Sequence, residues 1–224
     1  TFEGTEQTVV KVNGHKAKVD GMIYTSPPID LNEGANKLEV SITDIEGEFT
    51  KNLTVNKDTT PPELREVSPA EGYIINSSTF DVTGKIVDES PVRVYVDGII
   101  SEQTNSSFKN QLTYRDGNHT IEIRAVDMAG NEKIYQINGI VDTTLPNEFS
   151  VVADPADWTN NNRPEISFAT TDNASGINHY ELSMDDGPVE QISSQYQLLE
   201  LYDGEHNIAV KAIDNAGWKR LCIT

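Results

Sequence analysis

Apolar and polar residues alternate along most of this chain in short runs that end at glycine-containing turns. The clearest run, Thr120–Asp127, places Ile121, Ile123 and Ala125 on one face and polar residues on the other. A period of two is typical of a half-buried β-strand, and no stretch shows the 3.6-residue period of a helix. The pattern therefore predicts an all-β, antiparallel protein.

Seven strands of this kind are predicted in the middle of the chain. They are Leu64–Ser68, Phe80–Val87, Val92–Val96, Ile99–Thr104, Phe108–Tyr114, Thr120–Asp127 and Lys133–Val141. Seven short strands separated by turn residues predict a β-sandwich. Further strands are predicted at Lys37–Asp44 and through Phe49–Val55 before this region, and at Glu165–Ala169 and Arg220–Ile223 after it.

One motif occurs three times. A glycine turn leads into an alternating strand that ends on an aspartate ten residues after the glycine. The glycines are Gly34, Gly117 and Gly204, and the aspartates are Asp44, Asp127 and Asp214. Such recurrence is typical of a tandem array of small domains.

Two proline-containing segments divide the chain. Asp58 begins the first, which ends in Pro61 and Pro62, and 84 residues later Asp142 begins the second, which ends in Pro146. Because proline removes amide donors, neither segment can lie inside a sheet, and both are expected to be short, stiff linkers. The predicted domains are 1–59, 60–144 and 145–224, in an elongated array. The first is expected to be partial or truncated, since only 12 residues precede its turn at Asn13.

Composition narrows the possible partners. The chain has 17 basic and 36 acidic residues and a net charge of −19, which opposes binding to nucleic acid or to anionic lipid. Cys222 is the only cysteine, so no intrachain disulfide can form. No apolar run is long enough to cross a membrane, and Thr1–Gly4 does not resemble a signal peptide. We expect neither nucleic-acid binding nor membrane insertion.

Several of these segments together resemble bacterial immunoglobulin-like repeats. They are the Asp-Thr-Thr-Pro linker, Val94–Gly98, Ala125–Asn131, Trp158–Asn160 and Asp172–Gly176. The first domain departs from the pattern, with Asp44–Gly47 in place of the Ala-Gly-Asn turn. The resemblance implies tandem immunoglobulin-like domains of a bacterial surface adhesin, an S-layer-associated protein or the non-catalytic part of a secreted enzyme. It therefore implies an extracellular or cell-surface location.

The strand-end aspartates are the first candidate site. Each lies in register with the apolar face of its strand, so its carboxylate must find hydrogen-bond donors or a cation. One interpretation is a cap, in which the carboxylate accepts amide hydrogens from its own turn. The other is calcium, and the candidate ligands are Asp127, Asp142, Asp214, Asp58 and Asp88, with Glu89 and Asp172 as further loop carboxylates. An ion shared by Asp127 and Asp142 is one form of this hypothesis.

Aromatic residues are the second candidate site. Trp158, Trp218 and Tyr202, with Tyr196, could form a platform on which a sugar stacks, although core packing also explains them. The four histidines, His15, His119, His179 and His206, show no metal-ligand spacing and are expected to be solvated loop residues.

No catalytic motif is present, and we expect no enzyme activity and no required cofactor, with calcium as the one candidate ion. The leading hypothesis is a non-catalytic structural spacer that presents a functional domain outside this segment and could mediate adhesion. Its expected partners are neighbouring domains of the same polypeptide and a cell-wall or host glycan or protein. The alternative is a carbohydrate-binding accessory module of an extracellular polysaccharide-degrading enzyme.

Overall fold

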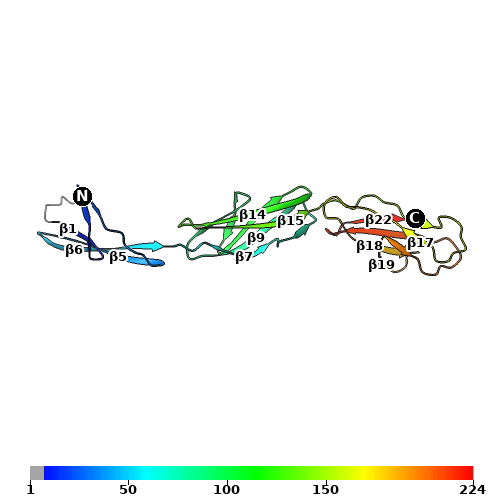
Figure 1. The fold of residues 1–224 in the computed structure, drawn as a ribbon, viewed down its shortest axis with the longest axis horizontal. Helices are drawn as coiled ribbons and strands as arrows, with labels where there is room; N and C mark the ends of the chain where they lie inside the picture. Colours follow the sequence, from blue (N-terminus) through cyan, green and yellow to red (C-terminus); the bar gives the residue numbers. More distant parts are fainter. Residues whose placement is uncertain (1–7, 224) are drawn as a thin grey trace. The chain divides into compact units, whose positions relative to one another are not determined.

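The computed structural model describes residues 8–223, and all regular structure in this range is β-strand (Figure 1). The all-β, antiparallel prediction is confirmed. Contacts divide the chain into two compact units. The first contains the residues up to Glu63 together with Asp88–Val92 and Val126–Lys133, and the second contains Leu64–Val87, Arg93–Ala125 and the residues from Ile134 onward.

The first unit is built around a four-stranded sheet with the order β2-β1-β5-β6. Its strands are β1 (Val9–Val12), β2 (His15–Lys16), β5 (Gly34–Asp44) and β6 (Gly47–Lys57), and β3 (Lys18–Asp20) pairs separately with β4 (Ile23–Thr25). The β5-β6 hairpin is paired from Gly34 with Lys57 to Asp44 with Gly47. Phe49 and Leu53 on β6 are exposed.

Two sheets hold the strands of the second repeat. One has the order β12-β13-β9-β7 and the other β11-β10-β14-β15-β8. The strands are β7 (Glu63–Ser68), β8 (Tyr73–Ile75), β9 (Thr79–Val87), β10 (Val92–Val96), β11 (Ile99–Ile100), β12 (Glu102–Thr104), β13 (Ser107–Thr113), β14 (Gly117–Asp127) and β15 (Glu132–Val141). This strand order is that of an immunoglobulin fold, with the first, second, fifth and fourth main strands in one sheet.

The predicted alternation is observed in the core. Ile121, Ile123 and Ala125 on β14 are fully buried, and Val82 and Ile86 on β9 are also buried. Polar neighbours on β14 are partly or fully exposed. Period-two patterning therefore fixes which face of these strands forms the core.

Two details of this region were not predicted. The stretch Ile99–Thr104 forms two short strands in different sheets, β11 beside β10 and β12 beside β13, with buried Ser101 between them. In addition, β8 pairs in parallel with the end of β15, with Tyr73 opposite Gly139. Three residues are too few to show a period, so β8 leaves no pattern in the sequence.

The third repeat is a smaller sandwich. Its sheets have the orders β16-β17-β20 and β19-β18-β21-β22. The strands are β16 (Val152–Asp154), β17 (Glu165–Ser167), β18 (Ile177–Met184), β19 (Glu190–Ile192), β20 (Gln195–Gln197), β21 (Ile208–Asp214) and β22 (Lys219–Ile223). Ile166 and Phe168 from the region of one sheet pack with Leu182 and Val210 from the other. The predicted linkers lie between strands, as expected from their prolines.

Candidate metal centres

Three aspartates of the first unit form a cluster. Asp58 follows β6, Asp88 follows β9, and Asp127 is the last residue of β14. One carboxylate oxygen from each lies within 4.8 Å of the other two. These strand ends therefore bring three carboxylates close enough together to coordinate a single ion.

An equivalent cluster lies in the second unit. Asp142 follows β15, Asp172 precedes β18, and Asp214 is the last residue of β21. Their ligand oxygens also lie within 4.8 Å of one another. Asp142 and Asp214 are almost fully buried, whereas Asp172 is half-buried.

The two clusters occupy homologous positions. Asp142 and Asp172 each lie 84 residues after their counterparts Asp58 and Asp88, and Asp214 lies 87 residues after Asp127. The five aspartates predicted from the sequence as calcium ligands all lie in these two clusters, together with Asp172, and the sequence left their grouping open. The hypothesis of one ion shared by Asp127 and Asp142 does not match this grouping, because Asp127 lies with the linker aspartate Asp58 while Asp142 lies in the second cluster.

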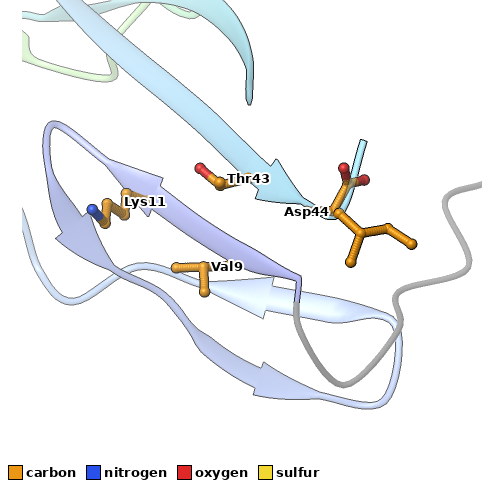
Figure 2. Close-up of a pocket in the computed structure, with 5 residues that line it drawn as sticks. Val9, Lys11, Thr43 and Asp44 are labelled. Atoms are coloured by element: carbon orange, nitrogen blue, oxygen red, sulfur yellow. The ribbon is translucent and has the colours of Figure 1, made fainter. Parts of the chain in front are cut away.

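The remaining copy of the motif, which ends at Asp44 in the first repeat, forms no such cluster with other residues that the structure describes. Asp44 lines a hollow of about 260 Å³ with Val9, Lys11 and Thr43, and Figure 2 shows the Lys11 side chain on the opposite side of the view from the Asp44 carboxylate. Asp44 Oδ1 accepts hydrogen bonds from the amides of Glu46 (2.8 Å) and Gly47 (3.2 Å). The predicted turn cap is present here, and among the described residues Asp44 supplies the one carboxylate that lines the hollow.

Asp127 also has the predicted cap. Its Oδ1 accepts hydrogen bonds from the amides of Gly130 (2.7 Å) and Asn131 (2.8 Å), and its Oδ2 accepts one from Asn131 Nδ2 (2.8 Å). Burial would raise the pKa of the Asp127 carboxyl, but these donors outweigh burial and hold the pKa below its usual value. Asp127 is therefore a satisfied, charged carboxylate.

Asp142 is held by neutral donors from both sides. Thr144 donates its amide (3.1 Å) and its hydroxyl (3.0 Å) to Oδ1, and the Ser175 hydroxyl donates to Oδ2. Burial opposes ionisation of Asp142, yet the hydroxyl of Ser175 and the donors of Thr144 lower its pKa overall. In Asp172, Oδ1 accepts amide hydrogens from residues 174–176.

Asp214 differs from both. Its Oδ1 accepts the Trp218 amide (2.8 Å), but its Oδ2 is buried and has no hydrogen-bond partner among the described residues. Burial raises the pKa of Asp214, and the charges of Asp142 and Asp172 raise it further. A buried carboxylate oxygen without a donor is costly unless a cation compensates for it.

The residues of the second cluster fit a hard divalent cation. Such ions take carboxylate, carbonyl and water oxygens, and here an aspartate with an unpartnered buried oxygen lies beside two further carboxylates. The hydrogen bonds to these three aspartates come from backbone amides and from the hydroxyls of Thr144 and Ser175, so none of those donors supplies a compensating positive charge. In the first cluster the unpartnered oxygen is Oδ2 of the half-buried Asp58.

The aromatic candidates separate into two groups. Trp158 and Tyr202 are both 91% exposed and line one hollow of about 660 Å³ in the third repeat. Trp218 is half-buried, and its Nε1–H donates to the Asp142 carbonyl oxygen (2.9 Å). Tyr196 donates its hydroxyl to Glu190. Trp218 thus belongs to the second aspartate cluster and not to the exposed aromatic pair.

Two histidines hold the glycine turns. His119 Nε2 lies 2.7 Å from the Arg115 carbonyl oxygen and His206 Nε2 lies 2.9 Å from the Tyr202 carbonyl oxygen, four residues earlier in each case. His206 lies in a loop, as predicted, whereas His119 lies in β14, and both side chains are half-buried and not fully solvated. The sequence carried a signal for this role, because each histidine lies two residues after its repeated glycine.

His206 has a second acceptor. Its Nδ1 lies 2.7 Å from Asp185 Oδ2, so both ring nitrogens face acceptors. Only the protonated ring can donate at both nitrogens, and accordingly the hydrogen bonds to the Tyr202 carbonyl and to Asp185 raise the pKa of His206. This pair ties the glycine turn to the β18-β19 connection.

No helix in the described part of the chain is long and apolar enough to span a membrane.

Comparison with known sequences gives two matches. A sequence model of the family described as "Glucodextranase, domain B" matches residues 62–142. Bacillopeptidase F from Bacillus subtilis (strain 168) is 29% identical over 119 residues, which cover 52% of this chain and 8% of that protein. The chain therefore corresponds to a small part of that curated relative.

Several solved structures are similar. Fibronectin(III)-like modules of Clostridium thermocellum CbhA cover 72% of this chain and 92% of their own, with 14% identity and a TM-score of 0.43. An I-band fragment of titin covers 97% and 86%, with 12% identity and a TM-score of 0.45. A bacterial ice-binding adhesin covers 96% and 83%, with 14% identity and a TM-score of 0.41. The strand order described above establishes the all-β, immunoglobulin-like fold.

Proposed function

We propose that this chain is a non-catalytic structural segment of a bacterial cell-surface or secreted protein. In this role its immunoglobulin-like repeats space or display a functional domain elsewhere in the polypeptide, and calcium fixes the linkers between repeats. Neighbouring domains of the same polypeptide are the primary partners. A cell-wall or host glycan or protein is the partner of the displayed part.

One observation carries this proposal. The three-aspartate cluster is built twice, and in each copy one aspartate comes from a linker while the other two end or follow strands of the next repeat. A catalytic site has no reason to recur at every linker, whereas a structural device does. The linkers also carry other ties, since Arg220 Nε donates to the Pro146 carbonyl oxygen (2.9 Å).

Calcium is the ion that these sites suit best. It accepts six to eight oxygens in irregular geometry, which loop and strand-end carboxylates can provide together with carbonyls and water. Magnesium demands a near-octahedral set and gives up its water reluctantly. Extracellular calcium modules of this kind have dissociation constants of about 10⁻⁴ to 10⁻³ M, matched to calcium levels outside cells.

Calcium is expected to raise the melting temperature of the 224-residue chain, because it binds the folded clusters and not the unfolded chain. Calorimetric titration should detect binding, and EDTA should reverse the thermal shift. Solution scattering should show a longer particle with calcium, since fixed linkers keep successive domains from folding back.

The control is Asp186→Asn, which removes one exposed negative charge outside both clusters. It should retain the calcium-dependent shift, whereas Asp142→Asn should reduce it. The proposal would be contradicted if neither the melting temperature nor the scattering profile changed on addition of calcium or EDTA.

A second function is favoured by the exposed aromatic pair. Trp158 and Tyr202 lie on loops that line one hollow, and exposed aromatic rings beside polar side chains suit a sugar ring. This arrangement supports a carbohydrate-binding accessory module of a polysaccharide-degrading enzyme. If that function holds, affinity electrophoresis on a panel of polysaccharides should show retardation that Trp158→Ala abolishes and Trp218→Phe does not. The absence of retardation on a broad panel counts against it.

A further inference from the structure

The two clusters differ in which aspartate carries the buried oxygen without a partner: it is the half-buried linker residue Asp58 in the first cluster and the strand-end residue Asp214 in the second. Each strand-end aspartate is followed four residues later by a side chain with an N–H group, Asn131 after Asp127 and Trp218 after Asp214. Both side chains make the same tie to the linker. Asn131 Nδ2 donates to the Asp58 carbonyl oxygen (3.1 Å), and Trp218 Nε1 donates to the Asp142 carbonyl oxygen (2.9 Å).

Only asparagine makes a second bond. The carboxamide nitrogen of Asn131 carries two hydrogens and also donates to Asp127 Oδ2 (2.8 Å). The indole of Trp218 carries a single N–H, which the Asp142 carbonyl already accepts. Trp218 therefore has no donor left for Asp214.

The consequence is visible in the two carboxylates. Both oxygens of Asp127 accept hydrogen bonds from its own turn. Asp214, which is 1% exposed, has a buried Oδ2 with no partner among the described residues, within the group that it forms with Asp142 and Asp172. The unpartnered oxygen of the first cluster belongs instead to Asp58, which is only half-buried. An amide hydrogen that points at a carboxylate oxygen occupies one of its lone pairs and repels an approaching cation.

We infer that the residue four positions after the strand-end aspartate ranks the two clusters, and that Trp218 makes Asp142, Asp172 and Asp214 the tighter divalent-cation site. The inference rests on the proposed cation-binding function and adds an order of filling to it. Asn131 acts in the opposite sense, because it satisfies Asp127 without an ion. Both are positioning residues, since neither is itself a cation ligand.

The order of filling can be measured with terbium and calcium. The chain has two tryptophans, so Trp158→Phe leaves Trp218 as the only one. Terbium luminescence excited through Trp218 then reports the second cluster, while calorimetry reports both. We expect two classes of calcium site, with the tighter class lost in Asp214→Asn, the weaker class lost in Asp127→Asn, and terbium luminescence saturating with the tighter class.

A pair of variants isolates the amide donor. Trp218→Asn introduces the carboxamide that the first cluster has, and Trp218→Phe removes the indole N–H without adding a donor. Calcium should bind the second cluster about tenfold more weakly in Trp218→Asn than in Trp218→Phe, as expected for one hydrogen bond to a charged oxygen. Circular dichroism checks that both variants fold.

The possible outcomes separate the two proposals. Three results would overturn the ranking while leaving calcium binding intact. They are a single class of calcium sites with equal affinity, loss of the tighter class in Asp127→Asn, and equal calcium affinities in the two Trp218 variants. If Trp218→Asn does not fold, the assignment of the classes by Asp214→Asn and Asp127→Asn still decides the ranking. A chain that binds neither calcium nor terbium would overturn the ranking and the proposed function together.

Discussion

Replacement of Gly84 by valine is expected to destabilise the second repeat by about 2–3 kcal/mol, at the upper end of the cost of overpacking a core. A Cβ atom at Gly84 would lie 2.5 Å from Cε1 and 2.7 Å from Cζ of the Phe108 ring on the paired strand, and 3.3 Å from Val67. The ring is 2% exposed, so it has no free space to enter. Urea denaturation of the purified chain measures the effect.

The matched control is Thr83→Val, one residue earlier on β9 and only partly buried. It adds the same side chain next to the site without touching the ring and should change stability by less than about 0.5 kcal/mol. Phe108→Leu in the Gly84→Val background should recover part of the loss, because the smaller side chain vacates the space of the ring. Equal stabilities of Gly84→Val and Thr83→Val would show that the ring is not held against the strand.

The fold could be predicted because burial on β14 and β9 follows the local alternation of residues. What the alternation could not show are contacts made by residues far apart in sequence. Strand β8 exists because the Tyr73 ring covers Gly139, where an added Cβ would lie 2.3 Å from the ring. A glycine and a tyrosine separated by 66 positions give no periodic signal.

The aspartates of the two clusters could be named as candidates from the sequence, but their division into two groups was not predicted. Asp127 ends β14 and Asp142 follows β15, and the two strands are joined by a short turn. Because neighbouring strands of a hairpin run in opposite directions, Asp142 must lie a full strand length away, about 30 Å for ten residues. The hairpin itself, readable from Ala129–Asn131, was enough to exclude an ion shared by these two residues.

The three glycine turns also share a contact that the residue types alone do not reveal. Asn36, His119 and His206 each lie two residues after the repeated glycine, and each side chain bonds to the carbonyl oxygen four residues earlier. Asparagine and histidine are chemically different side chains, yet each places a nitrogen atom close enough to bond this carbonyl oxygen. Repeats therefore preserve a geometric role more strictly than a residue type.

Asp214→Asn is expected to change the stability of the third repeat in opposite directions with and without calcium. In EDTA the variant should be more stable than the parent, because it removes a buried negative charge whose Oδ2 has no donor and which lies close to Asp142 and Asp172. The new side chain keeps a carbonyl oxygen for the Trp218 amide and brings two N–H donors to its acidic neighbours.

In calcium the order should reverse. A site filled at one hundred times its dissociation constant stabilises the folded chain by about 2.7 kcal/mol, and Asp214→Asn should lose most of that gain. Thermal unfolding of parent and variant in EDTA and in calcium gives the four values required.

Asp127→Asn is the matched comparison, and its expected behaviour differs for a structural reason. Asp127 already accepts hydrogen bonds on both oxygens. An asparagine at this position would lose the negative charge that the turn amides stabilise, and its own side-chain NH₂ group would face the Asn131 Nδ2 donor. This variant should therefore be less stable than the parent in EDTA as well as in calcium. If Asp214→Asn also loses stability in EDTA, the unpartnered oxygen of Asp214 carries no cost, and the case for a cation at that cluster fails with it.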